Sequence, residues 1–184
     1  MLTMTWTAYH NRGETLRAVI ATSAVRRDGL LPMDVEGVAA TFRDELDLLA
    51  ALTLKWHTRL SGHIERMLAH QPMDLDEAVA IAWSNTAHEL PGIRLIIDHY
   101  RAHPVDDAMA TAMAAATGKE HHLLAVMAGR SGIGADAAAR VGAEIEERAR
   151  ALHKGIPMLP AEEAYEEVAE PRTLLDRLRA VLAA

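Results

Sequence analysis

The chain of 184 residues contains no cysteine. This absence excludes disulfides, zinc sites built on thiolates and cysteine nucleophiles. It is also typical of proteins from a reducing compartment, so we expect a cytoplasmic protein. No apolar run reaches the roughly 18 residues that a membrane-spanning helix needs. The first residues, "MLTMTWTAYHNRGE", lack the basic region and the apolar run of a signal peptide, so we expect no membrane partner.

Basic charge is also scarce. The chain has 19 Lys and Arg against 26 Asp and Glu, which gives a formal net charge of −7 and a pI of about 5.8. Such a chain has no overall attraction for nucleic acids or anionic membranes. The only adjacent basic pair is Arg26-Arg27, and no further cations surround it. We therefore expect no direct contact with nucleic acid.

Residues that favour strands are few. The chain has one Phe and three Tyr, whereas alanine, leucine, arginine and glutamate dominate. This composition predicts an all-α fold, a mostly antiparallel bundle of about six or seven helices. The length predicts one domain over residues 1–184, in which about 154–184 forms a peripheral C-terminal helical tail.

Helix starts can be read from a repeated pattern of proline, an apolar residue and aspartate. Asp34, Asp74 and Asp106 are the predicted N-caps, because a carboxylate accepts from the free N–H groups of a first turn. Gly29 is the predicted left-handed end of the first helix. The predicted helices cover about 12–27, 35–70, 75–90, 91–103, 107–129 and 135–153, followed by tail helices from about 161. A helix over 35–70 would be roughly 50 Å long, so either part of it kinks or it pairs with a second copy, and we expect a homodimer.

Four residues form the candidate site. His99 and His103 are four residues apart, so both can face one point from a single helix, as two metal-binding imidazoles do. His63 and Glu120 fall among apolar residues on two other helices, and His63 is thereby expected to meet a polar group across the bundle. A cage of His63, His99, His103 and Glu120 would suit zinc, iron or manganese. Helical bundles build metal sites in this way.

A second interpretation needs no metal. A buried His and a buried Glu can pair simply because buried polar groups require partners, and Arg94 or Tyr100 could serve Glu120 equally well. If Glu120 is merely tolerated in the core, Glu120→Gln should be nearly neutral for stability. The sequence therefore favours a non-catalytic bundle that binds a small ligand or a protein partner. The alternative is a metal-binding bundle, either an enzyme or a metal carrier, that uses the His/Glu cluster.

Two short stretches resemble known helical families. "HYRAH", residues 99–103, resembles the His-x-x-x-His motif of hemerythrin-like bundles. The accompanying His-x-x-x-Glu does not start at His57 or His63, because Ser61 and Met67 stand four residues after them. "FRDELDLLAAL", from Phe42, resembles the junction between the DNA-binding and effector regions of TetR-type regulators. The segment between Gly29 and Phe42 has room for one short helix, whereas a helix-turn-helix needs two. Neither resemblance therefore assigns a family or a DNA-binding activity.

Overall fold

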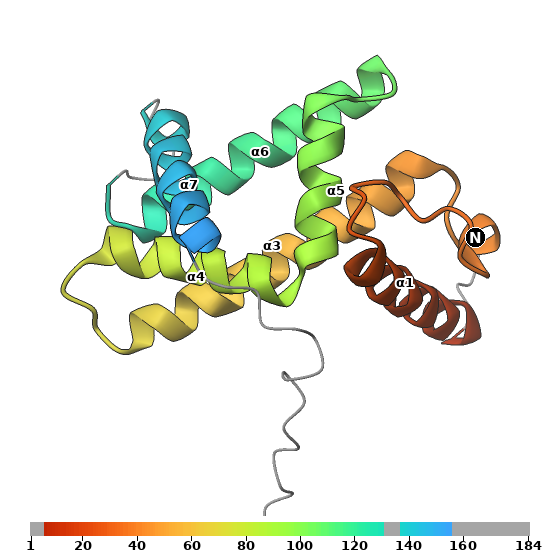
Figure 1. Ribbon diagram of the computed structural model, residues 1–184, viewed down its shortest axis with the longest axis horizontal. Helices are drawn as coiled ribbons and strands as arrows, with labels where there is room; N and C mark the ends of the chain where they lie inside the picture. Colours follow the sequence, from red (N-terminus) through yellow and green to blue (C-terminus); the bar gives the residue numbers. More distant parts are fainter. Residues whose placement is uncertain (1–5, 131–136, 156–184) are drawn as a thin grey trace, which may run out of the picture.

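A computed structural model describes residues 6–130 and 137–155 of the chain. Within these residues the chain forms seven α-helices and no strand, which confirms the predicted all-α bundle (Figure 1). The predicted tail from about 154 lies outside the described residues, apart from the end of the last helix. The helices are α1 (Trp6–Arg26), α2 (Val38–Thr41), α3 (Glu45–Ala69), α4 (Leu75–Glu89), α5 (Pro91–Ala102), α6 (Asp107–Met127) and α7 (Ala138–Gly155).

Most predicted helix ends are confirmed. Asp74 caps α4, where its Oδ1 accepts from the Glu77 amide at 3.0 Å. Asp106 caps α6 in the same way, with the Met109 amide at 2.7 Å. The prediction for α1 is wrong in position: the left-handed residue directly after the helix is Arg27, with a φ of +48°, and Gly29, with a φ of +76°, lies two residues further on.

The predicted helix over 35–70 is wrong at its N-terminal end. The chain instead makes the single-turn α2 and then α3, because Asp44 caps α3 by accepting from the Asp47 amide at 2.8 Å. Asp34 is not a cap, since its carboxylate pairs with Arg26 at 2.7 Å. The break shortens the long helix to the 25 residues of α3, so helix length no longer argues for a homodimer.

The helices cross closely where glycine removes a side chain. α7 packs on α4 and α6, α4 packs on α3, and α1 packs on α5 (Figure 1). A Cβ built on Gly142 of α7 would lie 2.0 Å from the carbonyl oxygen of His121 in α6. A Cβ on Gly92 of α5 would lie 2.3 Å from the backbone of Ser23 in α1. These two positions allow backbone to meet backbone, and α7 is thereby held over the interior.

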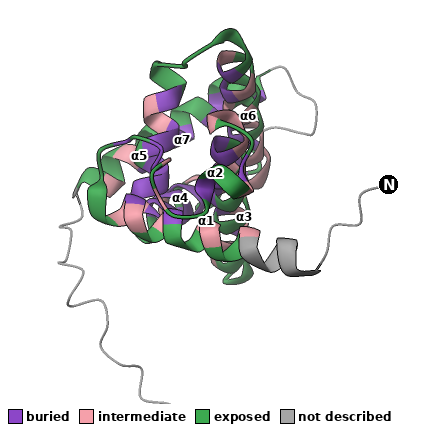
Figure 2. Ribbon diagram, turned by 90° about the vertical axis from the view of Figure 1, so that its right-hand side faces the viewer, coloured by how far each residue is buried: buried purple, intermediate pink, exposed green. Residues whose placement is uncertain are grey.

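The core contains two tryptophans that touch each other. Trp56 of α3 and Trp83 of α4 are fully buried, and their rings meet edge to face with centroids 5.5 Å apart. The buried residues line the inward faces of the helices around them (Figure 2). In the described part of the chain, no helix is both long and apolar enough to cross a membrane.

Candidate functional site

Glu120 of α6 is the centre of a buried polar cluster. Its side chain is 5% exposed, and it accepts from both core indoles: Trp56 Nε1 lies 3.0 Å from Oε2 and Trp83 Nε1 lies 2.9 Å from Oε1. The Arg94 guanidinium of α5 donates to Oε1 at 3.2 Å. The ring nitrogen Nε2 of His57 lies 3.4 Å from Oε2. Three helices, α3, α4 and α5, thus direct N–H groups at one carboxylate, which compensates its burial.

The cluster continues through Asp98 and Arg150. Arg94 donates to Asp98 Oδ1 from Nη2 at 2.6 Å, one turn along α5. Arg150 of α7 holds both oxygens of the same carboxylate, at 2.8 Å and 2.6 Å. The guanidinium carbons of Arg94 and Arg150 lie 5.5 Å and 5.1 Å from the centroid of the Trp83 ring, within the range of cation–π attraction. Asp98 therefore joins two arginines over one indole.

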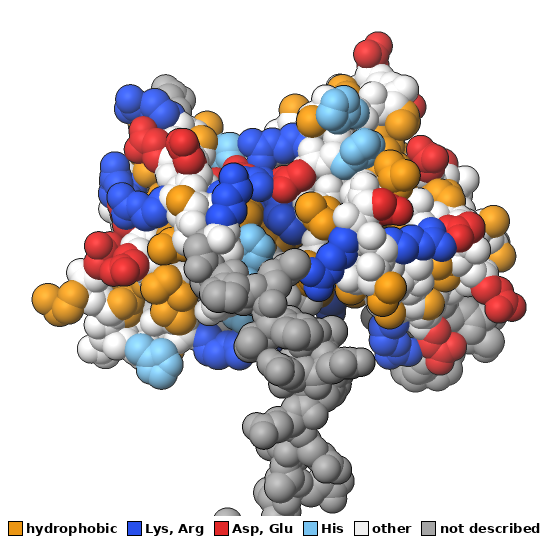
Figure 3. Space-filling view, in the orientation of Figure 1, with side chains coloured by type: hydrophobic (Ala, Val, Ile, Leu, Met, Phe, Trp, Pro, Cys, Tyr) orange, Lys and Arg blue, Asp and Glu red, His pale blue; other side chains and the backbone are white. Residues whose placement is uncertain are grey.

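Glu146 of α7 closes the far end of the cluster. It accepts from Arg150 Nη2 at 2.7 Å, from Arg101 Nη1 at 3.0 Å, and lies 2.6 Å from His121 Nε2. Its side chain is only 4% exposed. Charged side chains of both signs gather between α7 and α5 (Figure 3). We refer to this set as the charged network, and it consists of Arg94, Asp98, Arg101, Glu120, His121, Glu146 and Arg150.

The three carboxyl groups of the charged network stay ionised more readily than in an unfolded chain. Burial alone would raise their pKa values, but their neighbours outweigh it. The pKa of Glu120 is lowered by the nearby ring of His57, the charge of Arg94 and the indole of Trp83. The pKa of Glu146 is lowered by His121 and Arg150. Arg150 and Arg94 also lower the pKa of Asp98.

This lowering predicts a specific dependence of stability on pH. The unfolded chain protonates these groups near their ordinary values of 3.8 for Asp and 4.5 for Glu, and the folded chain does so only at lower pH. At pH values between the unfolded-state and folded-state pKa of a group, the unfolded chain binds more protons than the folded chain. The free energy of unfolding therefore falls as pH falls below about 4.5. Urea denaturation from pH 3 to pH 7 measures the slope. A stability that stays level down to pH 3 would contradict the assignment.

A cavity adjoins the charged network between α4, α5 and α7. Its volume is about 260 Å³, and Trp83, Ala87, Pro91 and Leu95 form its apolar wall. The polar side chains that line it come from both sides of the crossing; they are Arg27, Arg94, Asp98, Arg150, His153 and Lys154. Burial lowers the pKa of His153, and the charges of His88 and Arg150 add to the effect. This shift favours the neutral form of His153. We call this space the α4–α5–α7 cavity.

The structure places the predicted metal residues apart. Glu120 bonds to Trp56, whereas His63 lies seven residues further along α3, about 10 Å away. The polar partner of His63 is Glu89 of α4, with Nε2 2.8 Å from Oε2. His63 therefore meets a carboxylate across the bundle, as expected, but Glu120 is not that carboxylate.

His99 and His103 do come together, with ring centroids 5.3 Å apart. They lie on the side of α5 that faces the chain after α1, because His99 packs against Gly29. Among the described residues, no three His, Asp or Glu side chains are arranged to hold a metal ion.

The sequence did not predict several residues of the charged network. Arg94 was named as one partner for Glu120, and that pairing is confirmed. Asp98, Glu146 and Arg150 were not named, although Arg94 with Asp98 and Glu146 with Arg150 are oppositely charged pairs four residues apart. Such pairs are common on exposed helix faces, so only the crossing of α5 and α7 reveals that these two pairs contact each other.

Comparison with known protein families, with curated proteins and with solved structures found no match to this chain.

Proposed function

We propose that this chain is a non-catalytic bundle that binds a small ligand in the α4–α5–α7 cavity. The observation that carries the proposal is that the partly buried charged network reaches the wall of that cavity through Arg94, Asp98 and Arg150. A concave apolar space with a few convergent polar groups is the usual form of a small-molecule site.

Stability alone does not account for the charged network. Removing several charges from water is costly, and well-packed apolar residues of similar volume are often as stabilising as a buried ion-pair network. A network whose members hold each other in place does, however, present guanidinium groups in a set geometry. Arg150 is held from two sides by Asp98 and Glu146, so its orientation at the cavity is predetermined. This preorganisation supports a binding role.

The charged network also suits binding better than catalysis. A general acid or base at neutral pH works best with a pKa near 7. The pKa values of Asp98, Glu120 and Glu146 are instead lowered, because arginines or other N–H donors hold all three. These carboxylates remain ionised at neutral pH, and their oxygens already accept hydrogen bonds from neighbouring side chains. This supports a ligand-binding protein without turnover.

The test is a screen of small organic fragments by saturation-transfer NMR, followed by calorimetry. We expect fragments that bind the natural chain and lose binding in Leu95→Trp, which fills the cavity from α5. The matched control is Leu152→Trp, because the two leucines are 40% and 38% exposed but only Leu95 lines the cavity. Absence of any binding fragment, or equal loss in both variants, would refute the proposal.

The alternative of a metal-binding bundle has no arrangement of ligands to support it in the described residues. Elemental analysis of the purified chain after reconstitution with zinc, iron or manganese tests it directly.

A homodimer stays a proposal, and α3 offers a surface for it. Leu54 is 68% exposed. Grooves of about 360 Å³ and 470 Å³ lie on either side of it, toward α6 and α1. A second copy could therefore place its own Leu54 in one of these grooves.

If so, Leu54→Glu should convert a dimer into a monomer, as measured by light scattering during size-exclusion chromatography. Val25→Glu, at a position 84% exposed and outside both grooves, is the control that should leave the mass unchanged. A natural chain that is monomeric at high micromolar concentration would exclude the dimer.

A further inference from the structure

We infer that the ligand of the α4–α5–α7 cavity is a small organic anion, a carboxylate on a compact apolar body. This inference rests on the proposed function, and it adds the chemical class of the ligand. It comes from the charge, the hydrogen-bonding capacity and the size of the cavity.

The charge around the cavity is positive, although the whole chain carries −7. Four cations line the cavity against one carboxylate, Asp98. The network behind the wall adds one cation, Arg101, and two carboxylates, Glu120 and Glu146. Even with Arg27 left out of the count, cations exceed carboxylates by one, and the cations counted are Arg94, Arg101, Arg150 and Lys154. An anion that enters would meet a local field opposite in sign to that of the rest of the molecule.

The arginines at the cavity retain hydrogen-bonding capacity. A guanidinium has five N–H groups. Within the described residues, the bonds of Arg94 to Asp98 and Glu120 occupy three of these. Those of Arg150 to Asp98 and Glu146 occupy four. Two N–H groups of Arg94 and one of Arg150 therefore remain for a ligand, and carboxylates match guanidinium donors better than neutral acceptors do.

A cationic ligand has no comparable partner. Among the described residues, Asp98 is the one carboxylate that lines the cavity, and both Arg94 and Arg150 already hold it. An entering ammonium would face these two guanidinium groups and the Lys154 side chain. Like charges at short range in a partly enclosed site repel strongly.

The size and walls of the cavity restrict the rest of the ligand. A volume of about 260 Å³ lies at the lower end for small-molecule sites, which suits a single ring or a short branched chain. Trp83, Pro91 and Leu95 form an apolar wall that supplies no side-chain donor, because the Trp83 N–H is taken by Glu120. The ligand is thus polar at one end and apolar at the other.

The experiment compares probes that share one skeleton. Benzoate, benzamide, benzylamine and phenyl phosphate are titrated into the full chain by calorimetry at two salt concentrations. We expect benzoate to bind at least tenfold more tightly than benzamide, no binding of benzylamine, and weaker benzoate binding at high salt. Tighter binding of phenyl phosphate than of benzoate would overturn the carboxylate as the preferred anion.

The outcomes separate this inference from the proposed function. If benzamide or benzylamine binds as tightly as benzoate and Leu95→Trp abolishes that binding, the cavity is a ligand site and the inference of an anion is wrong. If no probe and no screened fragment binds, the proposed function fails as well.

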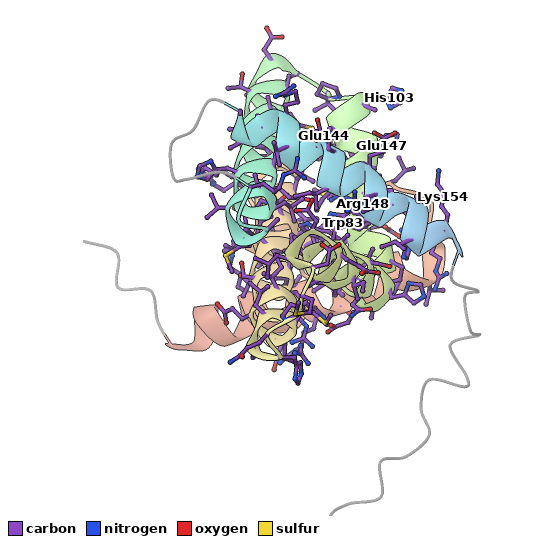
Figure 4. The ribbon with its side chains drawn as sticks, turned by 90° about the vertical axis from the view of Figure 1, so that its left-hand side faces the viewer. Trp83, His103, Glu144, Glu147, Arg148 and Lys154 are labelled. Atoms are coloured by element: carbon purple, nitrogen blue, oxygen red, sulfur yellow. The ribbon has the colours of Figure 1, made fainter. Side chains whose placement is uncertain are left out.

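Two variants that each remove one positive charge from α7 test whether benzoate binds in this cavity. Lys154 lines the cavity, whereas Arg148 is exposed and outside it (Figure 4). Lys154→Gln should weaken benzoate binding threefold to tenfold, and Arg148→Gln should leave it unchanged. Both side chains are exposed, so neither change should impair folding. Equal effects of the two variants would show that only overall charge matters, and would overturn the assignment to this cavity.

Discussion

Replacing Gly142 with alanine should lower the free energy of unfolding by at least about 3 kcal/mol, at the upper end of overpacking effects. The new Cβ would lie 2.0 Å from the His121 carbonyl oxygen and 2.4 Å from its carbonyl carbon, and backbone atoms in the middle of α6 have no alternative rotamer. In the Gly142→Ala variant, α7 must therefore move away from α6. Alanine is otherwise the better helix former, by about 1 kcal/mol, so the tertiary contact decides the sign of the effect.

Gly118→Ala is the matched control. Gly118 lies in the middle of the α6 sequence and is exposed, and a Cβ built there meets nothing within 4 Å. This change should stabilise the chain by roughly 0.5–1 kcal/mol through helix propensity alone. Urea denaturation of the two variants gives the comparison. Similar stabilities for both would mean that α6 and α7 are further apart than the structure has them.

The Gly142→Ala variant also tests how the charged network depends on this crossing. Glu146 is one turn after Gly142 on α7, and its carboxylate lies 2.6 Å from His121 Nε2. Arg150 is one further turn along and reaches Asp98. Separation of α7 from α6 should therefore weaken both contacts, and benzoate binding should be lost together with stability.

Local signals in the sequence predicted the helices well. Asp74 and Asp106 each mark a helix start by accepting from an amide within one turn, and Pro91 does so as the first residue of α5, so no knowledge of the fold was required. The break between α2 and α3 was missed because Asp34 and Asp44 are both suitable caps. The choice between them depends on Arg26, which pairs with Asp34 from a different helix.

The candidate site was predicted only in part, because its partners depend on how the helices cross. The position of Glu120 at the centre of an apolar face correctly predicted its burial. Its histidine neighbour is His57 rather than His63, a difference of less than two turns on α3. Helical periodicity gives the direction of a side chain around its own axis. It does not give the height at which α3 and α6 meet, and that height decides which histidine lies beside Glu120.

Replacing Glu120 with glutamine should destabilise the chain by about 3 kcal/mol or more, the range for a buried ion pair that loses one member. The sequence alone allowed a nearly neutral outcome, but the contacts of this carboxylate argue otherwise. Both oxygens accept from N–H groups, Oε1 from Trp83 and Arg94, and Oε2 from Trp56. Glutamine offers one oxygen and one NH₂ group. One indole N–H would therefore face another donor, and Arg94 would lose a counter-charge.

Glu89→Gln is the appropriate comparison for this change. Glu89 also accepts from an arginine and lies near a histidine, with Arg59 Nε at 2.6 Å and His63 Nε2 at 2.8 Å. Its side chain is 36% exposed, so solvent screens these contacts and the loss should stay within about 1 kcal/mol. Urea denaturation at pH 7 measures both variants. A loss below 1 kcal/mol for Glu120→Gln would show that Glu120 is only tolerated in the core.

A double-mutant cycle then assigns the effect to the pair. If Arg94 and Glu120 stabilise each other, Arg94→Met should also be destabilising, because Glu120 would be buried without its nearest cation. The variant that carries both Arg94→Met and Glu120→Gln should then lose markedly less stability than the sum of the two single losses, since neither charge is left without its partner. Additive losses would mean that the two groups contribute independently. The arginine that lines the cavity would then owe its position to Asp98 rather than to Glu120.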